Sequence, residues 1–156
     1  MNRRFARSTG FLASCAAGLA LAGCGLTHAT SPYDNPAASF GRLKTAFQVT
    51  GLHVCSQTPV DWKTQGFVKG TAYVVAADCA TVRNNPVASL VTVSQYASAR
   101  SRDTAEQQAN IFVRYAPVRA TTVWSYGPYL ITVSGARDPG SARIVNDALR
   151  NLGAAG

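Results

Sequence analysis

The chain has 156 residues, of which 47% are hydrophobic, and it carries a formal charge of +8 at pH 7. This length suits one ordinary domain with a real core, whereas a two-lobed solute-binding protein needs about twice as much chain. The basic residues between Arg42 and Arg150 are scattered, with no block of four or more. That spacing favours a solvated surface of mixed charge over a nucleic-acid-binding face.

The first 24 residues have the order of a bacterial export signal. Residues 1–7 carry three arginines, and an apolar run of about 14 small or aliphatic residues follows, which is short of the roughly 20 that cross a bilayer. The run ends in Leu21-Ala22-Gly23-Cys24, which resembles the lipobox of bacterial lipoproteins. The resemblance implies cleavage before Cys24, a diacylglyceryl group on its sulfur, and a protein anchored in a membrane outside the cytoplasm.

Two alternatives to this lipidated start stay open. Leu12-Ala13-Ser14-Cys15 fits a looser form of the motif, although it leaves only about seven residues for the apolar region. The other alternative is an ordinary secreted protein without a lipid. We predict a signal peptide over 1–23, a lipidated and flexible tether over 24–35, and a single domain over 36–156.

Capping residues and apolar spacing predict three helices. The first begins at Asn35-Pro36, the second runs from Asp103 to Tyr115 behind a near capping box, and the third begins at Asp138-Pro139 and ends before Gly153. The residues predicted to face inward are Phe40, Leu43 and Phe47 in the first helix; Ala105, Ala109, Phe112 and Tyr115 in the second; and Ile144, Val145, Ala148, Leu149 and Leu152 in the third.

Runs of β-branched and aromatic residues between the helices predict about five strands. A Gly127-Pro128 turn joins the last two strands into a hairpin, and the segment 56–70 is predicted to be the longest loop. The predicted strands are 52–55, 71–77, 89–96, 121–126 and 129–134. We therefore expect an α+β fold, with a mostly antiparallel sheet of about five strands and about three helices packed on one face. The specific arrangement that fits best is ferredoxin-like.

Cys55 and Cys79 are the two cysteines that follow the lipidated one. In an oxidising compartment such a pair predicts a disulfide, here closing a loop of about 25 residues. Metal binding is the alternative, because His53 and Asp78 lie next to these cysteines in the sequence. Zinc sites take three or four ligands with more closely spaced cysteines, so we predict a disulfide, no metal and no cofactor.

Side chains suited to catalysis are scarce. Asp61 and Asp78 are the acidic residues without a role at a helix or in the tether, and His53 is the histidine outside the tether. No nucleophile elbow, phosphate loop, metalloprotease motif or dinucleotide fingerprint occurs. A hydrolase of an envelope polymer that uses Asp61, Asp78 or His53 is therefore the alternative function, and it requires these side chains to converge in space.

Aromatic and basic residues around the last hairpin form the candidate binding site. Tyr and Trp are favoured at interfaces, and a neighbouring arginine adds cation–π or anion contacts. Trp124 and Tyr126 are expected to fill the core, and Tyr129 beside the turn is expected to be exposed. The candidate residues are Trp62, Tyr126, Tyr129, Arg119 and Arg137.

These observations favour a membrane-anchored lipoprotein of the cell envelope whose specific role is open. The shortage of acids and histidines favours a non-catalytic binding or accessory module over an enzyme. Its partners would be the membrane, through the lipid on Cys24, and an envelope protein or cell-wall component. Nucleic acid is not expected as a partner, because the export signal separates the protein from it.

Overall fold

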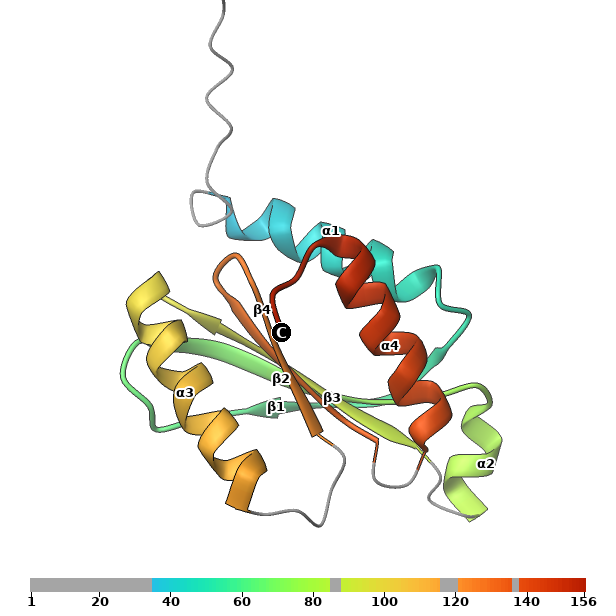
Figure 1. The fold of residues 1–156 in the computed structure, drawn as a ribbon. Coiled ribbons are helices and arrows are strands. Elements are labelled where there is room, and N and C mark those ends of the chain that lie inside the picture. The colour runs from blue at the N-terminus through green and yellow to red at the C-terminus, as the bar shows by residue number, and fades with distance from the viewer. Residues whose placement is uncertain (1–34, 85–87, 116–120, 136–137) are drawn as a thin grey trace, which may run out of the picture.

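A computed structural model describes residues 35–84, 88–115, 121–135 and 138–156. These residues form four helices and one antiparallel five-stranded sheet with the order β1-β2-β3-β5-β4, which confirms the α+β class (Figure 1). The elements are α1 (Pro36–Gln48), β1 (His53–Val60), β2 (Phe67–Ala76), α2 (Cys79–Asn84), β3 (Ser89–Tyr96), α3 (Ala99–Tyr115), β4 (Thr121–Tyr126), β5 (Tyr129–Ser134) and α4 (Pro139–Leu152).

Helices cover both faces of the sheet rather than one, so this part of the prediction was wrong. α1 and α4 pack together on the face that we call face A, and α3 packs on the opposite face, face B (Figure 1). The face A core joins Leu43 of α1 and Leu149 of α4 to Ile131 of β5. On face B, Leu130 packs with Ala105 of α3. The reason is that the sheet carries apolar side chains on both faces, with Val123 and Leu130 on face B, and each face needs its own cover.

β3 and β4 run parallel with β5 between them, because β5 is antiparallel to both. This β3–α3–β4–β5 segment is a split βαβ unit, a component of ferredoxin-like folds. The full ferredoxin-like assignment stays a prediction.

Local capping explains where two of the helices begin and how one ends. The side chains of Asn35 and Asp138 accept hydrogen bonds from the amides of Ala38 and Ser141, both at 3.0 Å, at the starts of α1 and α4. Gly153 follows α4 with φ 83°, a left-handed conformation that glycine adopts without strain. The helix boundaries predicted at these three residues are confirmed.

The start and the inward face of α3 differ from the prediction. Ser98 rather than Asp103 caps the helix, since its hydroxyl accepts a hydrogen bond from the Ser101 amide at 3.2 Å. The inward row then runs through Ala105, Ala109 and Val113. Phe112 and Tyr115 are 72% and 84% exposed, because they lie on the sides of the helix away from this row.

The predicted loop 56–70 is mostly strand. β1 continues to Val60 and β2 begins at Phe67, so only residues 61–66 connect them. Pro59 is tolerated because β1 is an edge strand. Gly70 reflects close packing rather than a turn, since a Cβ placed there would lie 2.6 Å from the Val60 side chain. The short helix α2 was not predicted.

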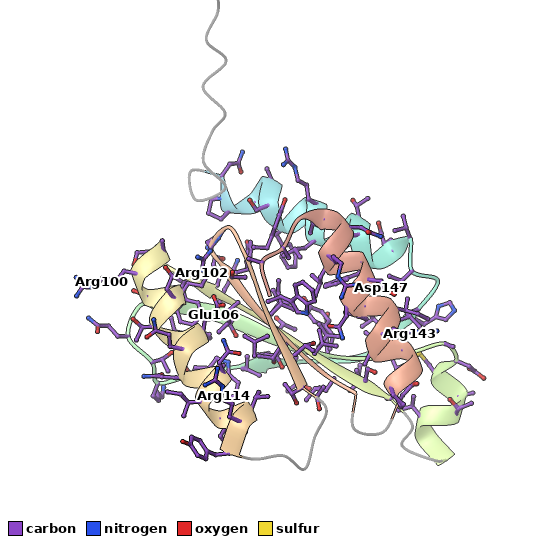
Figure 2. The ribbon with its side chains drawn as sticks, viewed as in Figure 1. Arg100, Arg102, Glu106, Arg114, Arg143 and Asp147 are labelled. Carbon is purple, nitrogen blue, oxygen red and sulfur yellow. A yellow bond between two sulfur atoms is a disulfide. The ribbon has the colours of Figure 1, made fainter. Side chains whose placement is uncertain are left out.

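Charged side chains lie on the outer sides of α3 and α4. Arg100, Arg114, Arg143 and Asp147 are exposed, and Figure 2 shows them directed away from the sheet. Arg102 instead reaches the last hairpin, where its guanidinium donates to the Gly127 carbonyl at 2.5 Å. Among the helices of the described residues, none is long and apolar enough to cross a membrane.

The Asp138 cap gives a testable pH dependence. Burial acts to raise the pKa of this carboxyl, but hydrogen bonds from Ser141 and Gly140 outweigh burial and lower the pKa below its ordinary value of 3.8. A lowered folded-state pKa means that the charged form stabilises the fold above pH 3.8. This contribution is lost as the pH falls through the folded-state pKa.

We expect Asp138→Ala to lower the free energy of unfolding by about 1 kcal/mol at neutral pH. The difference from the wild type should shrink at a pH below the folded-state pKa, because the wild-type carboxyl is then protonated. Urea denaturation at neutral pH and at this acidic pH measures it. Asp147→Ala, at an exposed position later in α4, is the control and should change stability by less than about 0.5 kcal/mol. An equal loss for Asp138→Ala at both pH values would contradict the charged-cap argument.

Candidate functional site: a groove between α1 and the sheet

The predicted catalytic groups do not converge. His53 begins β1 and Asp61 follows its last residue, so about 25 Å of strand separates them at 3.3 Å per residue. Asp78 caps α2 by accepting a hydrogen bond from the Ala80 amide at 2.8 Å, and Asp61 pairs with Lys63. Within the described ranges, no group of three or more His, Cys, Asp or Glu side chains could hold a metal ion.

Cys55 and Cys79 form the predicted disulfide, with their Cα atoms 5.1 Å apart. The bond links β1 to the start of α2. Cys55 lies at a bulge, because the register of β1 against β2 shifts between Val54 and Ser56. The alternative of metal binding at these cysteines is therefore wrong for this structure.

The aromatic residues of the last hairpin are largely structural. Tyr129 is 4% exposed and its hydroxyl donates to the Pro36 carbonyl at 2.9 Å, so the prediction that it is exposed was wrong. It lies on face A beneath the start of α1, and burial raises the pKa of its phenol. Trp124 is buried as expected, with its indole N–H donating to Asn146 at 2.9 Å. Tyr126 packs half-buried against the same core.

Trp62 is the remaining predicted binding residue that the structure describes, and it does not lie beside this hairpin's aromatic residues. Trp62 is 48% exposed, but its indole N–H donates to the Ser94 hydroxyl at 3.1 Å. Ser94 is opposite Leu130 in the sheet register, so Trp62 lies over face B. Arg119 and Arg137 lie outside the described residues. Among the described members of the candidate site, Trp62 therefore lies on the other side of the sheet from Tyr126 and Tyr129.

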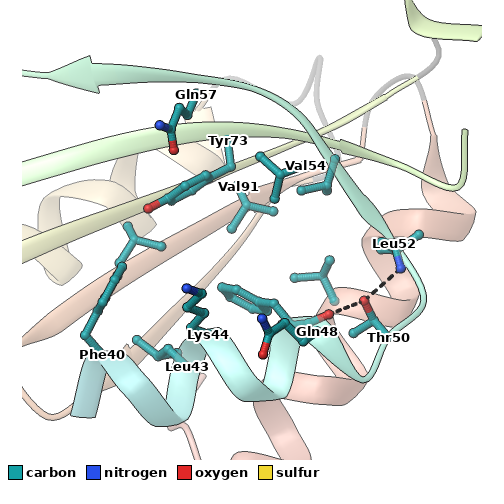
Figure 3. Close-up of a pocket in the computed structure, with 14 residues that line it drawn as sticks. Phe40, Leu43, Lys44, Gln48, Thr50, Leu52, Val54, Gln57, Tyr73 and Val91 are labelled. Carbon is teal, nitrogen blue, oxygen red and sulfur yellow. Dashed lines mark hydrogen bonds between the residues drawn. The ribbon is translucent and has the colours of Figure 1, made fainter. Parts of the chain in front are cut away.

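An apolar groove lies between α1 and the sheet, and we call it the α1 groove (Figure 3). Its cavity has a volume of about 380 Å³, within the roughly 300–1,000 Å³ typical of small-molecule sites. The main apolar side chains of its lining are Leu43 and Phe47 from α1, Tyr73 and Val75 from β2, and Val91 and Val93 from β3.

Packing of the two face A helices leaves this groove open. α4 lies over β3 and β5, and α1 packs along α4. The start of α1 contacts β5 through Phe40 and Pro36, which meet Tyr129. The part of face A formed by β1 and β2 is therefore only partly covered. Phe47 and Tyr73 stay half-buried, and Val54 at the sheet edge is 57% exposed. These apolar side chains therefore line the α1 groove and are not fully buried in the face A core.

The charges around the α1 groove are all positive. Lys44 lines it from α1, and Lys69 lines an adjoining hollow that shares Phe40, Tyr73 and Val93 with the groove. No Asp or Glu lines either space. In the part of the chain that the structure describes, neither lysine has a carboxylate partner.

No family model, curated protein or solved structure matches this chain. The site is therefore defined by its own geometry and chemistry. The polar groups around the groove are amide, hydroxyl and ammonium groups, among them Gln48, Gln57 and Lys44. They include no nucleophile beside a base and no pair of carboxylates, which the common hydrolytic mechanisms require. This set can hold and orient a ligand.

The α1 groove was not predicted from the sequence. One local signal exists, because Phe40, Lys44 and Phe47 recur at helical spacing and combine aromatic rings with a charge on one side of α1. The same pattern is typical of a helix that buries its apolar face and leaves the lysine at the edge. A helix that lines a groove differs from a helix buried in the core only in its distance from the strands, here β1 and β2.

Proposed function

We propose that this protein is a membrane-anchored lipoprotein of the bacterial cell envelope whose folded part is a non-catalytic binding module, with the α1 groove as its binding site. The observation that carries the binding role is a well-formed apolar groove lined by cationic and neutral polar groups, without acids. The anchoring rests on Leu21-Ala22-Gly23-Cys24 and its place behind a basic, then apolar, start. The disulfide accords with an oxidising compartment outside the cytoplasm.

The alternative of a hydrolase finds less support. Its three candidate groups do not meet in one place, because Asp61 follows the opposite end of β1 from His53, whereas Asp78 follows the end of β2 that pairs with His53. Asp61 is exposed and paired with Lys63 on the loop that leads to β2. None of the three lines the α1 groove. A binding role is therefore better supported than hydrolysis.

Intact mass and membrane fractionation test the anchor. We expect the wild type in the membrane fraction, with the mass of residues 24–156 plus a diacylglyceryl group, and Cys24→Ala without any lipid mass. Cys15→Ala is the matched control and should be processed like the wild type. A wild type without lipid, or loss of the lipid in Cys15→Ala, would exclude an anchor at Cys24.

A further inference from the structure

The α1 groove is apolar at one end and is extended at the other end by a hollow that Lys69 lines. We propose that it binds a long-chain fatty acid, with the acyl chain between α1 and the strands and the carboxylate near Lys44 and Lys69. This inference rests on the proposed binding role of the same groove. It adds the chemical class of the ligand and the direction in which the ligand lies.

The length of the groove suits one acyl chain. Its α1 side extends from Phe40 to Gln48, which is about 12 Å at 1.5 Å per residue. On β2, the groove and the adjoining hollow extend from Val75 to Lys69, about 20 Å at 3.3 Å per residue. One leaflet of a bilayer has a hydrocarbon thickness of about 15 Å, which is the reach of one acyl chain. A single chain with its polar end therefore fits lengthwise.

The two ends of this space differ in character. Leu52, Val54 and Val75 line one end, where an acyl tail would be removed from water. Lys69 lies in the hollow beyond Phe40, at the other end. Lys44 is one helical turn after Phe40, and Figure 3 shows its side chain directed from α1 into the groove, across from Tyr73. Lys44 is the middle residue of the α1 side, so an anionic head group at the Phe40 end would meet the Lys69 ammonium, with the Lys44 ammonium about one helical turn further along the groove.

The pattern of charge decides between an acid and a neutral lipid. A lysine without a carboxylate partner is available to a ligand, and a charge-assisted hydrogen bond is about twice as strong as a neutral one. Within the described residues, the acidic groups that form ion pairs lie at Asp61, Asp103 and Asp147, outside the groove lining. The site is therefore complementary to a carboxylate rather than to an alcohol or an ester.

Photo-crosslinking in isolated membranes that contain the full-length protein tests this ligand. The probe is a palmitic acid analogue with a diazirine in the chain and a terminal alkyne, and the matching long-chain alcohol is the neutral probe. We expect the acid to label peptides of α1, β1 and β2, and to label them about tenfold more than the alcohol. Labelling spread over the whole chain would overturn the proposal.

Two pairs of variants locate the contacts. Gln57→Trp places a large ring at the groove from an exposed position of β1, and it should reduce labelling by the acid at least fivefold. Thr58→Trp is the control, since successive strand residues point to opposite faces, and its labelling should equal that of the wild type. A cooperative urea transition with a midpoint close to that of the wild type shows that each variant has folded.

Charge reversal tests the head-group end. The double variant Lys44→Glu/Lys69→Glu should lose the preference for the acid, whereas Lys63→Glu, which lines neither the groove nor the hollow, should keep it. If acid and alcohol label the wild type equally and Gln57→Trp blocks both, the binding role stands but the fatty-acid proposal fails. If Gln57→Trp has no effect, both fail. Labelling that appears only in Cys24→Ala would mean that the protein's own lipid fills the groove, which also overturns the proposal.

Discussion

Replacing Ile131 with alanine should lower the free energy of unfolding by about 4 kcal/mol, the largest effect that we expect from a single substitution. Ile131 is 0% exposed and lies on β5, opposite Val93 of β3 and Trp124 of β4. It packs in the face A core with Leu149 of α4. Removing its branched chain leaves a cavity that three secondary-structure elements would have to close, and paired strands cannot shift far enough to do so.

Urea denaturation followed by tryptophan fluorescence measures this effect, because Trp124 is the cross-strand neighbour of Ile131. Ile111→Ala is the matched control on α3, where the side chain is 56% exposed. Its effect should stay within about 0.5 kcal/mol, since little apolar area is lost and alanine has the higher helix propensity. Similar losses for the two variants would mean that the face A core is not the main source of stability.

Loss of the Cys55–Cys79 disulfide should cost about 3 kcal/mol. The two cysteines are 24 residues apart in sequence, and in the chain-entropy treatment a cross-link over a loop of this size removes that much conformational freedom from the unfolded state. β1 is also an edge strand that pairs only with β2, so the bond to α2 holds its first residues at the end of the sheet. The double variant Cys55→Ala/Cys79→Ala removes the bond without leaving a free thiol.

The redox dependence of unfolding provides the control for this variant. The urea midpoint of the wild type should fall when a reductant is added, to about that of the double variant. The midpoint of the double variant itself should not respond to the reductant. A wild type whose stability is the same with and without reductant would contradict a stabilising disulfide. That result would also weaken the argument for an oxidising compartment.

Several elements could be predicted from sequence because their causes are local. The strands 89–96, 121–126 and 129–134 have the predicted bounds, since alternating β-branched and aromatic residues and a short turn define them within a few residues of chain. The helix ends at Asn35 and Asp138 depend on a side chain and an amide three residues later. The disulfide could be predicted because two cysteines follow Cys24 and an oxidising compartment was expected.

Errors arose where a residue has more than one local interpretation. Proline and glycine are common in loops. Here Pro59 lies in the edge strand β1, and Gly70 lies in β2 where the Val60 side chain leaves no room for a Cβ. Helical spacing from Ala105 and Ala109 predicts that Phe112 faces inward. α3 instead buries the smaller row that includes Ala109, because the start of the helix at Ala99 and its contact with face B set its rotation.

The sequence by itself determined the α+β class, most helix and strand positions, the cysteine pair and the scarcity of catalytic groups. It also carries the lipobox-like motif on which the proposed anchor rests. Only the tertiary structure decided that Tyr129 is buried, that His53 and Asp61 lie far apart, and that a groove opens beneath α1. These properties depend on how far one element stands from another. That distance follows from the packing of α1 against α4, which no short stretch of sequence encodes.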